Sequence, residues 1–377
     1  MKKTIFLIIL IMFPISVRGM ELIPNAKSGI LIEASSGKII YEKEKDVELS
    51  VASMTKMMAQ IIILEEIEKG NIKWNDKVKA SRNASDMGGS QIYLEEGEVM
   101  TVEDLMKGIS VASGNDATVA MAEYISGSEE KFVERMNSKA EEMGLLHTRF
   151  SNATGLDEKD HYSSSYDMGV IARELVINHS EILRFSSIYE DYLRENTDNK
   201  FWLVNTNKLV SQYEGTDGLK TGHTDDSGYC LAATTKRGNV RLIAIVLGEE
   251  DSKTRNKETM ELLDYGFNNI KVKTLKHKNS VIKTIKLEKA SVSSIKGILK
   301  DDLNIVYNDK NIKYEYRVNI NKIKYPLKKN QKIGIIEVVY KGKVLTKSDI
   351  ISSDSVNKIS FIDLFINNLI NLICGMF

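Results

Sequence analysis

The chain changes character near residue 270. Residues 1–270 mix helical and strand-like patterns and carry 31 Lys and Arg against 43 Asp and Glu. From residue 271 to 350, apolar and polar residues alternate, and 20 basic side chains stand against 7 acidic ones. The formal net charge of zero is therefore the sum of a −12 region, a +13 region and a −1 tail. This asymmetry predicts separate domains with different surroundings.

Composition excludes several classes of protein. A hydrophobic fraction of 42% is too high for a wholly disordered chain. Two cysteines, Cys230 and Cys374, cannot form a disulfide framework or a Cys-rich zinc site. The histidines show no metal-binding spacing and no glycine-rich phosphate loop is present, so we expect no metal, no cofactor and no nucleic-acid partner. The five histidines are His147, His161, His179, His223 and His277.

The N-terminus predicts export. Lys2 and Lys3 precede an apolar run over residues 5–15, and Val17 and Gly19 fit a signal-peptidase site. The run is too short for a membrane span of about 20 residues, so residues 1–19 are interpreted as a cleaved signal peptide. The alternative is an uncleaved N-terminal anchor. Either way, we expect the mature protein outside the cytoplasm.

The C-terminus predicts a membrane-surface helix over residues 356–377. Wound as an α-helix, this segment gathers its polar residues into an arc of about 140° and its apolar residues on the opposite face. A polar face along the whole length favours lying in the membrane interface over spanning it. The alternative is a terminal helix packed on its own domain. The polar residues are Asn357, Ser360, Asp363, Asn367, Asn368 and Asn371.

Between these ends, the pattern predicts two folded domains. Residues 20–270 are predicted to form an α/β or α+β domain. Its central antiparallel sheet is expected to combine strands from the two ends of this segment. Hairpins are expected at 28–43 and 228–248. Helices are expected at 53–69, 101–110, 117–125, 129–143, 165–178 and 253–267.

Residues 271–350 predict a small basic all-β domain. Strands are expected at 281–287, 304–306, 313–320, 332–340 and 343–347. The positive charge of this domain suggests that it faces anionic lipid headgroups or wall polymers.

The first chemical motif is Ser53-Met54-Thr55-Lys56. A spacing of three places the Ser53 hydroxyl and the Lys56 amine on one helix face. A serine hydroxyl needs a nearby base to act as a nucleophile, and a desolvated lysine can be that base. The alternative is a helix-capping serine followed by a surface lysine.

Two further motifs suit a peptide-binding cleft. Ser113-Gly114-Asn115 predicts a tight turn that can direct a hydroxyl and an amide into the same space. The alternative is an ordinary loop and helix cap, which has the same residue types. Lys220-Thr221-Gly222 precedes the strand at 229–235, and a cation and a hydroxyl on an edge strand suit the carboxylate end of a peptide. Gly222 is expected to let a ligand backbone approach closely. The alternative is a charged edge residue that discourages aggregation.

Together, in this order and at these separations, the three motifs resemble those of the active-site-serine penicillin-recognising enzymes. The chain is most similar to the low-molecular-mass penicillin-binding proteins that are D-alanyl-D-alanine carboxypeptidases. The resemblance is close over about residues 22–270. The β domain and the terminal amphipathic helix match that family's layout more loosely. Further segments carry the resemblance: Met87-Gly88-Gly89-Ser90-Gln91, Asn152-Ala153-Thr154-Gly155-Leu156-Asp157, His161-Tyr162-Ser163, and Asp217 to Thr224 around the Lys-Thr-Gly motif.

The resemblance implies a role for each catalytic residue. Ser53 would be acylated, Lys56 would take its proton, and Ser113 would relay a proton to the leaving amine. The backbone N–H groups of Ser53 and His223 would form the oxyanion hole.

The resemblance also implies how the substrate is held. Asn115 would hold the substrate amide, Lys220 would add positive potential, and Thr221 would bind the terminal carboxylate beside Gly222. Arg255 would help to orient that carboxylate, with a plain surface arginine as the alternative. Some relatives have an arginine where Thr206 stands, so that contact is not carried over.

The implied function is a serine D-Ala-D-Ala carboxypeptidase. It would remove the terminal D-alanine from peptidoglycan pentapeptides and would also bind β-lactams covalently. A serine β-lactamase shares Ser53 and Lys56, but the chain has no Glu-x-x-Leu-Asn run and carries an extra β domain. A non-catalytic wall-binding protein is the third alternative. Cys230, on the strand beside the site, is interpreted as a buried structural thiol.

Overall fold

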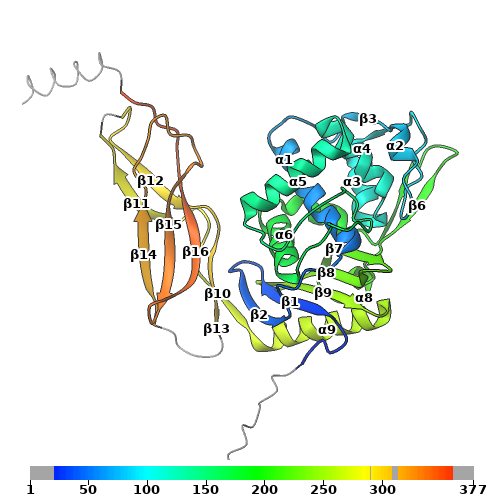
Figure 1. Ribbon diagram of the computed structural model, residues 1–377. Coiled ribbons are helices and arrows are strands. Elements are labelled where there is room, and N and C mark those ends of the chain that lie inside the picture. The colour runs from blue at the N-terminus through cyan, green and yellow to red at the C-terminus, as the bar shows by residue number, and fades with distance from the viewer. Residues whose placement is uncertain (1–20, 289, 308–312, 360–377) are drawn as a thin grey trace, which may run out of the picture.

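The protein consists of an α/β body and a smaller all-β body beside it (Figure 1). The computed structural model describes residues 21–288, 290–307 and 313–359. The predicted signal peptide, and residues 360–377 of the predicted terminal helix, lie outside the described residues. Among the residues that are described, no helix is both long and apolar enough to cross a membrane.

The α/β body is built on a five-stranded antiparallel sheet with the order β2-β1-β9-β8-β7. The first strand lies between its hairpin partner and a strand more than 200 residues later, so distant segments do close the sheet as predicted. The strands are β1 (Ser28–Glu33), β2 (Lys38–Lys43), β7 (Thr216–Thr224), β8 (Gly228–Arg237) and β9 (Val240–Glu249).

Both faces of this sheet are covered. Ile30 and Ile245 face a core shared with helices α1 (Lys56–Glu68) and α6 (Ser165–Asn178). Leu31 and Val246 face a second core shared with helix α9 (Ser252–Asn269). Burial on both faces explains why the middle of each strand is a continuous apolar run, at residues 30–32 in β1 and 242–247 in β9. The sheet therefore forms a rigid support, and β7 is one of its two edge strands.

Most helices of the α/β body begin and end close to the predicted positions. α5 and α6 match the prediction residue for residue, and the hydroxyls of Ser128 and Ser164 accept hydrogen bonds from their first-turn N–H groups. The helices are α1 (Lys56–Glu68), α2 (Arg82–Ser85), α3 (Val102–Lys107), α4 (Asn115–Ser126), α5 (Glu129–Met143), α6 (Ser165–Asn178), α7 (Leu183–Ser186), α8 (Leu209–Gln212) and α9 (Ser252–Asn269). Two short hairpins add β3 (Lys77–Lys79) with β4 (Val99–Thr101) and β5 (Glu190–Leu193) with β6 (Phe201–Val204).

Two predicted helices change their winding where they reach the cleft. The helix expected from Ser53 starts as a 3₁₀ turn, Ala52–Thr55, before it becomes α1. The helix expected at 101–110 is α3 followed by a wider π turn, Gly108–Ala112, which ends at Ser113 in the left-handed conformation. Deviations of this kind are frequent at functional sites, and hydrophobic periodicity does not reveal them.

The all-β body contains a five-stranded antiparallel sheet, β11-β12-β16-β15-β14, and a two-stranded ribbon of β10 and β13. The ribbon follows α9 and joins the two bodies (Figure 1). β10 and β12 were not predicted, although each is as long as β11 and β14. The strands are β10 (Lys271–Lys276), β11 (Val281–Lys286), β12 (Ser294–Leu299), β13 (Leu303–Tyr307), β14 (Glu315–Ile320), β15 (Lys332–Tyr340) and β16 (Lys343–Ser352).

The predicted start of the terminal helix at Val356 is wrong. β16 continues to Ser352, Val356 pairs with Leu327, and Lys358 pairs with Ala290 as isolated β-bridges. Val356 is 1% exposed and packs in the core of the β domain. Residues 356–359 are thus extended, because the first apolar residue of the supposed helix is buried against the sheet.

We expect Val356→Ala to lower the stability of the β domain by roughly 2 kcal/mol, because it removes two buried methyl groups. Urea unfolding followed by circular dichroism measures this change. Val292→Ala is the matched control, since Val292 is 46% exposed in the same domain and its loss should cost about 0.5 kcal/mol or less. Equal effects of the two substitutions would contradict the placement of Val356 in the core.

Candidate active site

A cleft of 360 Å³ lies along the edge strand β7. It is bordered by the 3₁₀ turn that carries Ser53, by the corner at Ser113, and by the start of α9. The three motifs of the sequence, separated by more than 160 residues, therefore meet at one place. The lining residues are Ser53, Ser90, Ser113, Thr206, Lys208, Thr221, Gly222, His223, Tyr229, Ser252, Arg255 and Asn256.

Ser53 and Lys56 are in direct contact. The Lys56 Nζ lies 2.8 Å from the Ser53 Oγ and donates a second hydrogen bond of 2.7 Å to the Thr154 carbonyl oxygen. Lys56 is fully buried, and its pKa is held well below its usual value, chiefly by burial and then by the positive charge of Lys220. A lowered pKa favours the neutral amine, which is the form that can accept a proton from the serine.

The loop around Gly155 fixes the turn that carries Ser53. The Asn152 Oδ1 accepts hydrogen bonds from the N–H groups of Thr154 and Gly155, which closes the loop tightly. Gly155 has a φ of +87°, and a Cβ there would overlap the carbonyl group of Ala52. The glycine of the Asn-Ala-Thr-Gly segment is therefore required by close packing against the residue before Ser53.

His161 supports the same turn from behind. Its Nδ1 accepts a hydrogen bond from the Ser151 N–H, so the proton is on Nε2, which lies 2.7 Å from the Thr55 Oγ1. Burial lowers the pKa of His161 to about 4, which keeps the ring neutral at pH 7. We therefore assign His161 a structural contact with the turn and no acid–base role.

The Ser113 corner is anchored by a buried carboxylate. Asp116 accepts hydrogen bonds from the backbone N–H groups of Ile92 and Leu94, which ties the corner to the loop after Ser90. By contrast, the Ser113 Oγ and the Asn115 Oδ1 are buried and have no partner among the described residues. A buried polar atom without a partner costs about 1–3 kcal/mol, so these two atoms are candidates to bind a ligand.

Lys220 is the second buried lysine of the site. Its Nζ donates a 2.9 Å hydrogen bond to the Thr221 carbonyl oxygen. Burial, followed by the nearby charge of Arg255, lowers the pKa of Lys220 to about 7. The Thr221 hydroxyl donates to the Thr206 Oγ1 at 2.7 Å, so Thr206 contacts the motif although it lacks the arginine of some relatives.

The structure corrects the expectation for Gly222. A Cβ at this position would lie 2.6 Å from the Val51 carbonyl oxygen and 3.2 Å from the Ala52 Cβ. The missing side chain therefore makes room for the protein's own Ser53 turn, rather than for the backbone of a ligand. His223 lies at the mouth of the cleft, where its exposed ring packs on Tyr229 with a centroid distance of 4.0 Å.

Arg255 is not a plain surface residue. It is 5% exposed, lines the cleft, and donates from Nε and Nη2 to the Asn256 Oδ1 at 3.1 and 2.8 Å. Cys230, on β8, is fully buried, and burial raises the pKa of its thiol to about 11, so the prediction of a structural thiol is confirmed.

Some residues that line the cleft were not predicted from the sequence. Lys208 lines the cleft with its Nζ 5.5 Å from the centre of the Tyr189 ring, and Tyr229 and Asn256 were also not singled out. No acidic residue is among the described residues that line the cleft. The cleft therefore favours an anionic ligand, and no local pattern around Lys208 could have indicated this.

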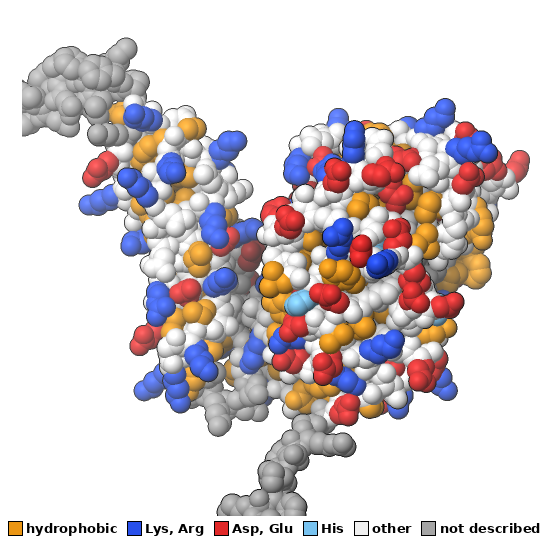
Figure 2. Space-filling model, viewed as in Figure 1, with side chains coloured by type: hydrophobic (Ala, Val, Ile, Leu, Met, Phe, Trp, Pro, Cys, Tyr) orange, Lys and Arg blue, Asp and Glu red, His pale blue; other side chains and the backbone are white. Residues whose placement is uncertain are grey.

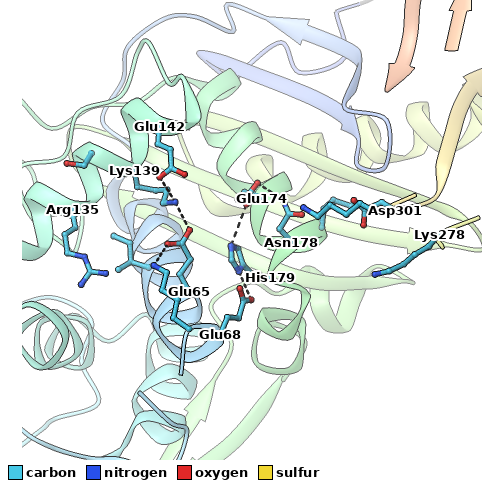
Figure 3. A pocket seen from close by; sticks show the side chains of 15 residues that line it. Glu65, Glu68, Arg135, Lys139, Glu142, Glu174, Asn178, His179, Lys278 and Asp301 are labelled. Atoms are coloured by element: carbon cyan, nitrogen blue, oxygen red, sulfur yellow. Dashed lines mark hydrogen bonds and ion pairs between the residues drawn. The ribbon is translucent and has the colours of Figure 1, made fainter. Parts of the chain in front are cut away.

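A second cavity, of 870 Å³, lies where the two bodies meet (Figure 3). Its charged groups largely satisfy one another: Lys139 is 2.6 Å from Glu65, and His179 is 2.8 Å from Glu68. Lys278 and Asp301 reach it from the β domain. Its described lining residues include none of those that line the Ser53 cleft, and we interpret it as a cavity at the junction between the bodies.

Comparison with known proteins identifies both parts of the chain. Residues 20–251 match the family model of the D-alanyl-D-alanine carboxypeptidases, and residues 271–358 match that of the penicillin-binding protein 5 C-terminal domain. D-alanyl-D-alanine carboxypeptidase DacF of Bacillus subtilis is 46% identical over 351 residues, which cover 92% of this chain and 89% of that protein.

Solved structures agree with these matches. Penicillin-binding protein 5 from Haemophilus influenzae aligns with a TM-score of 0.70 and 29% identity, over 89% of this chain and 98% of that one. Penicillin-binding protein D2 from Listeria monocytogenes, in its ampicillin-bound form, aligns with a TM-score of 0.59 and 30% identity, over 64% and 98%. The α/β domain with its central antiparallel sheet and the all-β domain that follows are thus both confirmed.

Substitution of Gly155 tests how the Ser53 turn is supported. Gly127 and Gly155 have nearly equal positive φ angles, but a Cβ at Gly127 meets nothing within 4 Å. Gly127→Ala should therefore cost about 1 kcal/mol of stability from backbone strain alone. Gly155→Ala should cost clearly more, because it also displaces the turn, and urea unfolding compares the two. Similar costs would contradict the packing argument.

Proposed function

The chain belongs to the D-alanyl-D-alanine carboxypeptidase family, and on this premise we propose that Ser53 is the nucleophile of the reaction. The activity is the release of D-alanine from the D-Ala-D-Ala end of peptidoglycan peptides by a serine hydrolase. The observation that carries the assignment is the Lys56 amine, which is buried, holds a lowered pKa and lies 2.8 Å from the Ser53 Oγ.

Acylation follows from this contact. As the Ser53 Oγ attacks the carbonyl carbon of the penultimate D-alanine, its proton passes to the lone pair of neutral Lys56. The backbone N–H groups of Ser53 and His223 stabilise the negative charge on the carbonyl oxygen. The C–N bond then breaks, and Ser113 passes a proton from Lys56 to the departing D-alanine amine. The unpartnered Ser113 Oγ supports this role.

Substrate binding uses the cationic side of the cleft. Thr221 and Arg255 bind the terminal carboxylate, with Lys220 adding positive potential behind Thr221. The Asn115 Oδ1 accepts a hydrogen bond from the substrate amide, which would give this buried atom the partner it lacks. The absence of acidic side chains among the described lining residues supports a carboxylate ligand.

Water then hydrolyses the acyl-enzyme and regenerates Ser53. A β-lactam enters by the same step, because its strained amide is attacked by Ser53 and leaves an acyl group on the same oxygen. The ampicillin-bound Listeria relative supports this assignment. We further propose that the natural substrates are pentapeptide stems.

Members of this family act on the cell wall, outside the cytoplasm. We propose that this chain is exported by its N-terminal signal and held on the outer face of the cytoplasmic membrane by an amphipathic helix within residues 360–377. The wide apolar face of that segment supports the anchor.

We expect Ser53→Ala to abolish both D-alanine release from a diacyl-Lys-D-Ala-D-Ala peptide and covalent labelling by a fluorescent penicillin. Release is followed by a coupled D-amino-acid oxidase assay, and labelling by fluorescence after denaturing electrophoresis. Ser138→Ala is the matched control, because Ser138 is exposed on α5 and should leave both signals unchanged.

Two outcomes would contradict this assignment. Rapid penicillin turnover without D-alanine release would identify a β-lactamase. Neither label nor release from the unsubstituted protein would leave a non-catalytic wall-binding protein.

The pH dependence of acylation should report the coupling between the two lysines. The rate rises with pH as Lys56 loses its proton, and the Lys220 charge lowers the pKa of Lys56. Lys220→Met removes that charge and should move the acid limb of the profile to higher pH. Lys220→Arg keeps the charge above the Lys220 pKa of about 7 and should move it the opposite way.

The measurement is the second-order rate constant for fluorescent-penicillin labelling as a function of pH. A shift in the same direction for both variants would contradict the electrostatic coupling.

A further inference from the structure

One end of the β domain gathers exposed lysines around the point where the described chain ends. We call this end the tip; it comprises the loop between β14 and β15, the loop between β11 and β12, and residues 353–359. Its exposed lysines are Lys322, Lys324, Lys328, Lys329 and Lys358.

The three segments of the tip are joined by backbone hydrogen bonds. Leu327 and Val356 exchange two N–H···O bonds of 2.8 Å, and the Lys329 N–H donates to the Ser355 Oγ at 3.0 Å. On the other side, the Ser291 N–H donates to the Asn357 carbonyl oxygen at 2.9 Å. Residues 353–359 are thus held by hydrogen bonds between the two loops. The lysines therefore lie on a surface with a defined backbone.

These charges are not neutralised within the protein. None of the five tip ammonium groups pairs with a carboxylate among the described residues, whereas Lys332, just beyond the loop, is 2.7 Å from Asp349. Among the described residues of the tip the carboxylates are Glu288 and Asp354, so these residues have a net charge of about +3. Val292, 46% exposed, adds an apolar side chain to it.

The direction of the chain indicates what this surface meets. Residues 360–377 continue from the tip, and their sequence has the wide apolar face proposed above as the anchor. A membrane bound by that segment must therefore lie next to the tip lysines. Figure 1 shows the tip at the end of the β domain away from the β10–β13 ribbon, and Figure 2 shows lysine and arginine side chains along this domain.

We propose that the tip binds the headgroups of anionic phospholipids as a second membrane contact, separate from the helix. The proposal rests on the membrane anchoring stated under the proposed function. Exposed lysines close to a bilayer are attracted to its negative surface, and the attraction falls with added salt. The contact orients the β domain with its ribbon, and hence the catalytic domain, directed away from the lipid.

The test compares two variants of the mature chain, residues 20–377, on vesicles of phosphatidylcholine with or without phosphatidylglycerol. The tip variant replaces four lysines by glutamine: Lys322, Lys324, Lys328 and Lys329. The control variant makes the same replacement at four exposed lysines on strands of the same domain: Lys273, Lys283, Lys343 and Lys347. The two variants have the same net charge, and thermal melting checks that both are folded.

We expect the tip variant to bind anionic vesicles about tenfold or more weakly than the unsubstituted chain, with a flatter salt dependence. The control variant should lose clearly less, and binding to pure phosphatidylcholine should be the same for all three proteins. Equal losses in both variants would overturn the proposal in favour of diffuse attraction. Unchanged binding by the tip variant would also overturn it.

Two further readouts separate this contact from its alternatives. Failure of every protein to bind pure phosphatidylcholine would contradict the helical anchor, while a tip-specific difference on anionic vesicles would still support the present proposal. If the tip variant lost binding to isolated anionic wall polymer but not to anionic vesicles, the lipid proposal would be overturned.

Discussion

The active site depends on the burial of the Lys56 amine. A lysine in water is protonated at pH 7 and cannot take a proton from serine, so the fold has to desolvate it. The Thr154 carbonyl oxygen accepts a hydrogen bond from the buried amine, and Gly155 brings that loop against the Ser53 turn. Gly222 lets the edge strand approach the same turn from the other side. In the mechanism proposed above, the packing of two glycines thus determines whether Ser53 has a base.

A second lysine acts on the pKa of the first. The charge of Lys220 lowers the pKa of Lys56, and Arg255 in turn lowers the pKa of Lys220 to about 7. Lys220 and Arg255 are buried groups of like charge, and holding such charges together without compensation is costly. A substrate carboxylate would supply negative charge to a cleft whose described lining residues include no acidic side chain. Binding of the correct substrate therefore relieves a repulsion that the free enzyme retains.

Much of the fold and the motif residues of the site could be predicted from the sequence, because they follow local patterns. The helical period of 3.6 residues predicted both ends of α5 and α6 to the residue. The spacing of three residues correctly placed Ser53 beside Lys56. Contacts between distant segments could not be predicted in this way. Lys208 lines the cleft only because the tertiary fold brings it there. From the sequence, Val356 resembles the first apolar residue of a helix, but in the structure it pairs with Leu327.

The net charge of the catalytic domain and the charge of its cleft have opposite signs. The catalytic part is acidic overall, yet its cleft is lined by cations, whereas the β domain is basic over its surface. Long-range fields are screened within about 8–10 Å at physiological ionic strength, so the net charge of a domain has little effect inside its cleft. The cleft can therefore select a carboxylate while the acidic exterior is repelled by an anionic membrane. In the membrane-bound arrangement proposed above, the same repulsion, together with attraction at the tip lysines, favours an orientation in which the catalytic domain faces the cell wall.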